Sequence, residues 1–343
     1  MIYFLAFISA FLLSVIFTMA IKKIALKFKI VDLPDQKRKK HLRPMALLGG
    51  TAIFLAFFST LYFFKNYLLQ SNLNWQHWLG FFIGSLILII GGFLDDKYNL
   101  KPGQQLIFSV LAALVVTIGG VGINKITNPF GDSIIHLNAA GAMMILSSAF
   151  TFLWLLGMMY TTKILDGLDG LVTGLTGIGA LVIFLFTMTT RYYQPDMGLA
   201  ALVLLASCLG FLIFNFHQAK IFLGEGGSLF LGFALGVLAI ISGGKVAIAL
   251  LVMGLPILDL GWIIIRRWRA GHNPLKTADR LHLHYQLMDL GWGTKKTVLF
   301  FYVFSLLFGL SALFLQSRGK LLAIGLLGMA MFVIVGKLKK KDF

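Results

Sequence analysis

Six acidic residues of this chain lie at the ends of long apolar stretches, in segments that also carry Gly, His, Lys or Arg. The chain has only 13 Asp and Glu against 30 Lys and Arg, so this grouping of scarce acids is unusual. A carboxylate close to hydrocarbon is costly and is rarely kept without a use. Together with the neighbouring Gly and His residues, the acids indicate a metal-assisted site for phosphate groups. They are Asp95, Asp96, Asp166, Asp169, Glu225 and Asp279.

The first pair, Asp95 and Asp96, closes the apolar stretch that ends in GGFLDDKYNL. Adjacent carboxylates repel each other, and a divalent cation relieves that repulsion. Mg²⁺ favours oxygen ligands from one or two carboxylates together with substrate phosphates. The alternative is that DDK only marks a helix end near water.

Asp166 and Asp169 occur in ILDGLDGLV, three residues apart, and would therefore share one face of a helix. Gly167 and Gly170 allow a backbone to approach a ligand closely. A helix that starts here would direct its free N–H groups toward a phosphate. The alternative is an ordinary capped helix start, because Asp is a good N-cap.

Glu225 lies in the glycine-rich segment FLGEGGSLFLG, which leads into an apolar stretch. Such a turn resembles a phosphate-binding nest, and an acid within it suits a metal ion better than a phosphate. The preceding segment, NFHQAKIF, supplies Asn215, His217 and Lys220 as polar ligands or as ordinary interfacial residues.

His282 and His284 occur in the basic segment ADRLHLHYQL, next to Arg280 and Asp279. Two residues apart, they share one face of an extended segment but not of a helix. Contact with a pyrophosphate fits them better than zinc, for which no Cys partner is present. Asp259, inside the apolar stretch GLPILDLGW, is predicted to be structural, pairing with a basic group or orienting a neighbouring helix.

The elements that position these residues are predicted to be membrane-spanning helices. The composition is 58% hydrophobic and 13% charged, far from the roughly 25% charged of soluble domains. One span needs about 20 apolar residues. The sequence predicts an all-α polytopic bundle forming a single domain, residues 1–343. Its eleven spans lie near 2–21, 46–65, 77–94, 104–123, 138–160, 168–189, 198–216, 227–242, 246–265, 297–315 and 320–336.

Charge distribution sets the expected orientation. Most Lys and Arg fall in the loops after odd-numbered spans and at the C-terminus, which places the N-terminus outside and the C-terminus in the cytoplasm. The first segment lacks a basic start and a cleavage site, so it is predicted to be a retained span. The net charge of +17 then reflects topology and anionic substrates, and a nucleic-acid partner is not expected. The single cysteine, Cys208, is predicted to serve helix packing.

Six segments, in order along the chain, resemble the polyprenyl-phosphate N-acetylhexosamine-1-phosphate transferases, glycosyltransferase family 4. They are VDLPDQKRKKHLRPMALLGG, GFLDDKYNLKPGQQ, KILDGLDGLVTG, GFLIFNFHQAKIFLGEGGSLFLGF, PILDLGWIIIRR and DRLHLHYQL. The resemblance implies transfer of a sugar 1-phosphate from a UDP-N-acetylhexosamine to undecaprenyl or another polyprenyl phosphate, with release of UMP. It further implies Mg²⁺, with Mn²⁺ as a substitute, and an early step of wall or lipopolysaccharide synthesis at a bacterial plasma membrane. A homodimer is an open expectation.

The resemblance also implies roles for matching residues. Asp95 would orient the lipid phosphate or act as a base, while Asp96 and Glu225 would serve the metal site. Asp166 and Asp169 would bind the nucleotide and order the metal site. The implied substrate-binding residues are Lys40, His41, Lys163, Asn215, Lys220, Arg280, His282 and His284.

Three positions depart from the family's usual pattern. Glu225 stands where an Asp is usual, Lys163 where an Asn is usual, and Tyr285 where a further His often follows. The alternatives are an ion-coupled membrane transporter and an inactive lipid-binding homologue. Carriers usually hold charge near the bilayer midplane, often with repeated halves, whereas these acids cluster at one interface and no repeat is evident.

Overall fold

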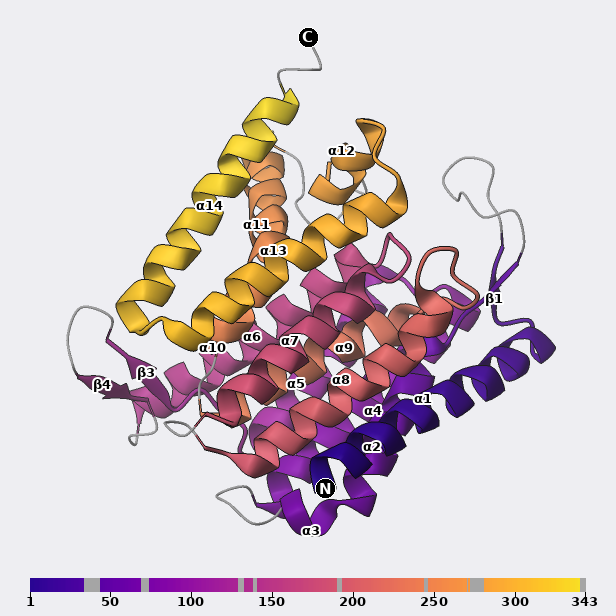
Figure 1. Ribbon diagram of the computed structural model, residues 1–343, viewed down its shortest axis with the longest axis horizontal. Coiled ribbons are helices and arrows are strands. Elements are labelled where there is room, and N and C mark those ends of the chain that lie inside the picture. Colours follow the sequence, from indigo (N-terminus) through magenta and orange to yellow (C-terminus); the bar gives the residue numbers. More distant parts are fainter. Residues whose placement is uncertain are drawn as a thin grey trace.

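The computed structural model is mostly helical, with 79% of the described residues in helices, and this confirms the all-α class (Figure 1). It describes residues 1–33, 44–68, 74–128, 133–137, 141–189, 193–243, 246–269, 271 and 281–339. The helices are α1 (Ile2–Lys27), α2 (Gly49–Phe63), α3 (Lys65–Leu68), α4 (Trp75–Tyr98), α5 (Pro102–Ile118), α6 (Ala142–Leu165), α7 (Leu171–Thr187), α8 (Pro195–Asn215), α9 (Glu225–Ile241), α10 (Val246–Val252), α11 (Gly254–Arg269), α12 (Leu283–Asp289), α13 (Thr294–Phe314) and α14 (Ser317–Lys339).

Two short antiparallel strand pairs join helices at the edges of the bundle. Strand β1 (Val31–Asp32) pairs with β2 (Met45–Ala46), with Val31 opposite Ala46. Strand β3 (Lys125–Thr127) pairs with β4 (Ile134–His136). In Figure 1 these two pairs lie on opposite sides of the helices.

Each of the eleven predicted apolar stretches contains a helix, which supports a multi-pass membrane protein. By length and composition, five of the described helices can cross a membrane, namely α1, α4, α6, α8 and α13, and the bent pair α10–α11 makes a sixth. Helices α2, α5, α7 and α9 are apolar but have 10–17 residues. The number of eleven passes and the orientation of the termini stay predictions.

The ninth predicted span is not one straight helix. Helices α10 and α11 meet at Met253 with an angle of 79°. Pro256, in the first turn of α11, lacks an amide hydrogen, and its ring crowds the carbonyl four residues earlier. A proline at this place therefore explains why the apolar stretch breaks rather than continuing as one rod.

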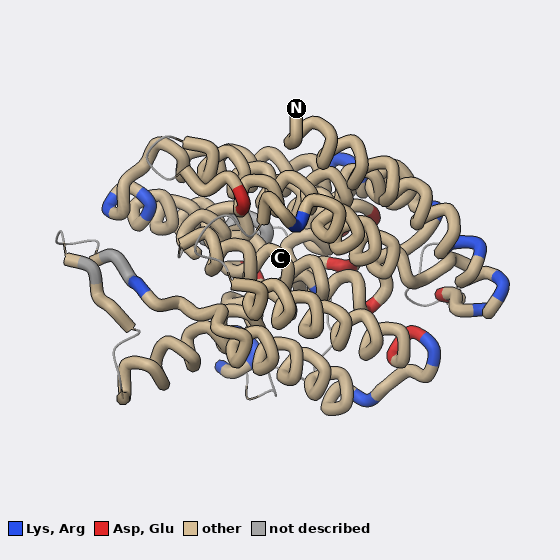
Figure 2. Tube along the Cα trace, turned by 90° about the horizontal axis from the view of Figure 1, so that it is seen from below, with Lys and Arg blue, Asp and Glu red and all other residues tan. Residues whose placement is uncertain are grey.

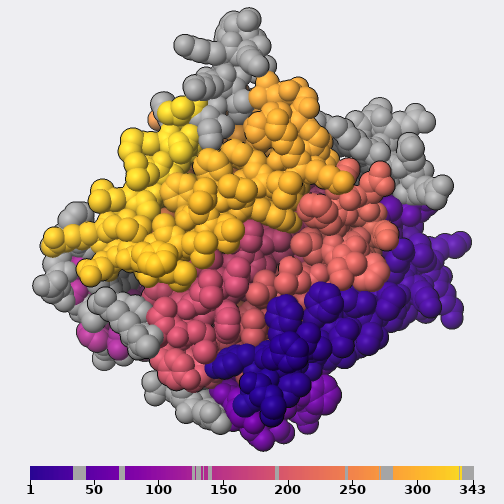
Figure 3. Space-filling view, viewed as in Figure 1, coloured from indigo at the N-terminus to yellow at the C-terminus, as the bar shows by residue number. Residues whose placement is uncertain are grey.

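Helix α9 forms the core of the bundle and is buried from Gly226 to Ile240. It packs against α2, α4, α6, α7, α8 and α10, whereas α1 packs on α8, and α13 on α7. Figure 3 shows α13 and α14 covering one side of the visible face, with α7 and α8 between them and α1. The residue that opens the central helix is Glu225, so the core fixes the position of a candidate site residue.

Glycine contacts bring α9 unusually close to two neighbouring helices. A Cβ atom on Gly92 of α4 would lie 2.0 Å from the backbone nitrogen of Gly226. A Cβ on Gly50 of α2 would lie 1.9 Å from the Cα of Gly227. Small residues let helix backbones approach in this way, which is common in membrane bundles. Both contacts lie next to Glu225 and therefore set its distance from α4 and α2.

Charged residues are concentrated toward one end of the bundle. Figure 2 shows most of the described Lys and Arg residues, and most of the acids, in the right half of the view. A smaller group of Lys and Arg lies at the opposite end. Because Asp95 and Asp96 lie in the last turn of α4 and Glu225 opens α9, the candidate site lies at helix ends rather than at their middle.

Candidate active site

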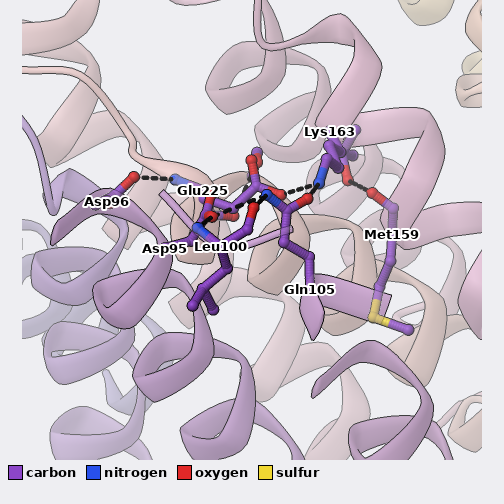
Figure 4. Close-up of polar contacts among 9 residues, drawn as sticks. Asp95, Asp96, Leu100, Gln105, Met159, Lys163 and Glu225 are labelled. Atoms are coloured by element: carbon purple, nitrogen blue, oxygen red, sulfur yellow. Dashed lines mark hydrogen bonds and ion pairs between the residues drawn. The ribbon is translucent and has the colours of Figure 1, made fainter. Parts of the chain in front are cut away.

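The two acids of α4 lie in its last turn and face different partners. The helix ends at Tyr98, and the next residue, Asn99, adopts a left-handed conformation with φ 51°. The chain then returns, so that the Leu100 N–H and the Gln105 side-chain amide both donate to Asp95 Oδ1 at 2.8 Å. Asp96 Oδ1 accepts the backbone N–H of Glu225 at 3.1 Å (Figure 4). Asp96 thus ties the end of α4 to the start of α9.

The loop just before Glu225 is hydrogen-bonded to the start of α2, and this contact fixes the position of Glu225. The N–H groups of Gly49 and Gly50 donate to the carbonyls of Phe222 and Leu223 at 2.9 and 2.8 Å. Gly224 then turns the chain with φ 75°, a conformation that favours glycine. A Cβ at Gly224 would lie only 2.4 Å from Asp96 Oδ2, so the absence of a side chain is what admits the Asp96 carboxylate.

Lys163, near the end of α6, lies between these acids. Its ammonium forms an ion pair with Glu225 Oε1 and donates to Gln105 Oε1 at 2.7 Å. It also lies 5.7 Å from the centre of the Tyr160 ring. In Figure 4 the contacts run from Glu225 through Lys163 and Gln105 to Asp95. Gln105 had no predicted role, because nothing in a glutamine within KPGQQ marks its partner on another helix.

Asp166 and Asp169 lie in the turn between α6 and α7, not on a helix face. Helix α6 ends at Leu165, and α7 begins at Leu171 after Gly170, whose φ is 77°. Asp169 Oδ2 accepts the Ala219 N–H at 3.1 Å and lies 3.8 Å from His217 Nδ1. A helix does begin after this segment, but the prediction that the two acids share a helix face is wrong, and the N-cap residue of α7 is Gly170 rather than an Asp.

Asn215 is a buried side chain that joins this turn to the loop before α9. Its Oδ1 accepts the Gly170 N–H at 3.2 Å and the Thr173 hydroxyl at 3.1 Å, and its Nδ2 donates to the Ile221 carbonyl at 3.0 Å. The side chain thus fixes the loop geometry on both sides. Lys220, in the same loop, has an exposed side chain.

Of the two predicted histidines, His284 lies against Gly167, next to Asp166, and His282 stacks on it. His282 caps α12 with extended backbone, and its ring stacks on that of His284 at 5.7 Å and 11°. A Cβ on Gly167 would lie 3.2 Å from His284 Nε2. His282 Nδ1 lies 2.8 Å from Asp259 Oδ2, so the predicted structural pairing of Asp259 with a basic group is confirmed.

Negative charge is crowded at Asp166. Its side chain keeps an exposed face, yet the protein atoms around it remove much of its hydration, and this burial raises the pKa of its carboxyl well above the ordinary range. The next causes are the negative charges of Glu225, Asp96 and Asp169. Asp166 therefore belongs electrostatically with the acids of α4 and α9. A cation bound between these acids would reduce the repulsion among their negative charges.

Comparisons with known proteins bear on the whole chain. A family model described as glycosyl transferase family 4 matches residues 78–243. A probable undecaprenyl-phosphate N-acetylglucosaminyl 1-phosphate transferase of Bacillus subtilis is 32% identical, over 91% of this chain and 84% of the relative. The chain belongs to glycosyl transferase family 4.

Two further relatives of this glycosyl transferase family 4 member have related names. A decaprenyl-phosphate N-acetylglucosaminephosphotransferase of Mycolicibacterium smegmatis is 29% identical over 82% of this chain and 74% of the relative. An undecaprenyl-phosphate alpha-N-acetylglucosaminyl 1-phosphate transferase of Thermotoga maritima is 30% identical over 90% of this chain and 88% of the relative. All three names specify a polyprenyl phosphate and an N-acetylglucosamine phosphate.

The segment that matches the glycosyl transferase family 4 model contains the α4 acids, Lys163, the Asp166–Gly170 turn, Asn215 and Glu225, whereas the His pair lies beyond it. A hollow of about 390 Å³ next to this site is lined by His217, Gln218, Gly293, Thr294 and Lys295. Among the described residues, no three His, Cys, Asp or Glu side chains are close enough to hold a metal ion by themselves. The predicted site residues Lys40, His41 and Arg280, and the acid Asp279, lie outside the described residues.

Proposed function

We propose that this protein transfers N-acetylhexosamine 1-phosphate, GlcNAc 1-phosphate in the first instance, from a UDP-sugar to a polyprenyl phosphate. The products are a polyprenyl-diphospho-sugar and UMP. The names of relatives that match most of the chain support the acceptor and the transferred group. The wall or surface glycan that follows is a separate question.

The observation that carries the proposal is the meeting of scarce acids from separate elements near one end of the bundle. Asp95 and Asp96 end α4, Glu225 opens α9, and Asp166 lies in the turn after α6. A hydrogen bond joins Asp96 to Glu225, Gln105 and Lys163 link Asp95 to it, and charge repulsion couples Asp166 to these acids. Such a cluster suits two anionic substrates only when positive charge accompanies it.

The donor set fits Mg²⁺. Carboxylate oxygens are the ligands that this ion prefers, and one or two carboxylates plus substrate phosphates suffice to bind it. Asp96 and Glu225 would hold the ion, at a place where Gly224 leaves room for the Asp96 carboxylate. When bound, the ion would neutralise charge on the donor pyrophosphate.

In the proposed reaction, an oxygen of the lipid phosphate attacks the β-phosphorus of the UDP-sugar. A new phosphorus–oxygen bond forms, the bond from the β-phosphorus to the bridging oxygen breaks, and UMP leaves with that oxygen. A lipid phosphate is largely ionised near neutral pH, so a strong base is not required. Asp95, held by two donors at 2.8 Å, is suited to positioning the acceptor.

Of the other predicted ligands, His284 lies against Gly167 in the turn that holds Asp166. Because Asp259 holds His282 and the ring stacks on His284, the imidazole pair has one fixed orientation. We propose that the pair supports the donor side of the site through this turn. Asn215 then acts by fixing the neighbouring loop, since its amide is bonded to the protein on both ends.

We further propose that the chain crosses a bacterial plasma membrane eleven times, with the N-terminus outside and the site on the cytoplasmic face. The excess of Lys and Arg in the loops after odd-numbered spans supports this orientation. UDP-sugars are made in the cytoplasm, so the donor would reach the site from that side. A homodimer is compatible with this arrangement and would not alter the chemistry.

The proposal is tested with purified protein, undecaprenyl phosphate and UDP-GlcNAc in detergent and in sealed proteoliposomes. Release of UMP together with a lipid-linked sugar supports the transferase. Movement of UDP-GlcNAc into the vesicles without product supports a carrier, and binding of the lipid with neither result supports an inactive homologue. A panel of UDP-N-acetylhexosamines with Mg²⁺, Mn²⁺ or a chelator then identifies the donor and the metal requirement.

A further inference from the structure

Four helices meet through one continuous chain of polar contacts. It runs from Glu225 on α9 to Lys163 on α6, then to Gln105 on α5 and Asp95 on α4 (Figure 4). The two acids at its ends belong to the site proposed above. Between them, Lys163 supplies the only positive charge in this chain of contacts, and Gln105 supplies the only amide.

The chemistry of the groups fixes the direction of each contact. An ammonium only donates hydrogen bonds, and a carboxylate only accepts them. The Gln105 amide must therefore turn its oxygen to Lys163, at 2.7 Å, and its nitrogen to Asp95, at 2.8 Å. The same nitrogen also donates to the Leu100 carbonyl at 3.2 Å, and the Leu100 N–H donates to Asp95. Gln105 thus links the Lys163 ammonium to the Asp95 carboxylate through one hydrogen bond on each side.

Lys163 is not an ordinary solvated lysine. The side chains of Lys163 and Glu225 keep only 22% and 18% of their accessible surface. A charge removed from water to this extent is stabilised only with partners, and the ion pair, the Gln105 oxygen and the Tyr160 ring provide them. The Lys163 ammonium therefore interacts mainly with Glu225, Gln105 and Tyr160 rather than with solvent.

We propose that Lys163 is a built-in counterion of Glu225 that a divalent cation must displace, and that Gln105 is a positioning residue that couples Lys163 to Asp95. The pair Lys163–Glu225 then sets how tightly the site holds a cation before substrates arrive. The consequences for catalysis rest on the proposed function, whereas cation binding does not. If Lys163 only contacted the donor phosphates, removal of its ammonium would not change how tightly Glu225 binds a cation.

The test measures Mn²⁺ binding to the full-length protein in detergent by electron paramagnetic resonance, without donor or lipid. Lys163→Met should bind Mn²⁺ about tenfold more tightly than the wild type, because a nearby positive charge and a competitor for Glu225 are both removed. Lys97→Met is the matched control. It removes an exposed charge that lies over the Phe93 and Tyr98 rings on α4, and it should leave the affinity within about twofold.

A second pair of variants identifies the acid that is released. In Lys163→Met/Glu225→Gln the gain in affinity should disappear, since the freed carboxylate is gone. Equal or weaker binding in Lys163→Met, including no binding in either protein, overturns the counterion role. Should Lys163→Met unfold in a melting experiment, Lys163→Gln removes the same charge while keeping a hydrogen-bonding side chain, and the same criterion applies.

The Gln105 role has its own test. Gln105→Glu keeps the side-chain shape and can still accept a hydrogen bond from Lys163. Its second carboxylate oxygen would face the Asp95 carboxylate, and the two negative charges would repel each other. Coupling predicts that Gln105→Glu lowers kcat at least as much as Gln105→Met, about tenfold or more, with little change in the donor KM. A purely packing role predicts the reverse order, with the isosteric Glu better tolerated, and this result would refute the coupling. Absence of transfer by the wild type would refute the proposed function while leaving the Mn²⁺ result interpretable.

Discussion

Gly92→Ala is expected to inactivate the protein without touching any acid. A Cβ at Gly92 would lie 2.0 Å from Gly226 N and 2.1 Å from Gly226 Cα, whereas ordinary contacts begin at 3.4 Å. Both neighbours are backbone atoms, so α4 and α9 must separate by about 1.4 Å locally. The Asp96–Glu225 hydrogen bond, now 3.1 Å, lies within one turn of this contact and would be lost. A misplacement of about 1 Å at a reacting site costs roughly 100-fold in rate.

The assay compares kcat/KM for lipid-linked product formation with the melting temperature of the same preparation. Gly157→Ala is the matched control, because it also adds a methyl group within a membrane helix and no atom lies within 4 Å of the new Cβ. It should retain nearly full activity, since alanine favours a helix over glycine by about 1 kcal/mol. Activity of folded Gly92→Ala within about twofold of Gly157→Ala would refute the claim that the α4–α9 contact sets the site.

Three further substitutions test single contacts. Glu225→Gln should raise the Mg²⁺ concentration for half-maximal rate by about tenfold, and an unchanged requirement would remove Glu225 from the metal site. Asp95→Asn tests a base role through its pH–rate profile, for which the positioning role predicts an unchanged shape with a lower rate. Asn215→Ala loses three hydrogen bonds in a buried place and should destabilise the fold by about 2–4 kcal/mol, seen as a lower melting temperature. An unaltered melting temperature would show that the loop holds without Asn215.

The sequence predicts the helices well because apolar length and sequence order are local properties. Each predicted stretch contains a helix, and Asp95 with Asp96 was expected at the end of the stretch where α4 ends. The bend at Met253 was not predicted, although Pro256 in the sequence was a signal for it. Helices α2, α5 and α7 are also shorter than the stretches predicted for them.

The contacts of the site depend on tertiary packing and were only partly predicted. The Gly and acid patterns identified Glu225 and the Asp166–Asp169 segment as candidates. The ion pair of Lys163 with Glu225 and the bridging position of Gln105 join helices that are far apart in sequence. Such pairings leave no periodic or compositional signal. Asn215 was expected to be a ligand, but the sequence does not reveal the two loops that its amide connects.

The proposed reaction transfers a sugar together with its phosphate at the acid cluster. The most direct measurement incubates the purified protein with undecaprenyl phosphate and UDP-GlcNAc labelled with ³²P in the β-phosphate, and then extracts the lipid. The label should move into the lipid fraction as UMP is released, and Asp96→Asn should abolish this movement. Label that stays in the aqueous phase as UDP while the sugar reaches the lipid would contradict it, as would no lipid product at all.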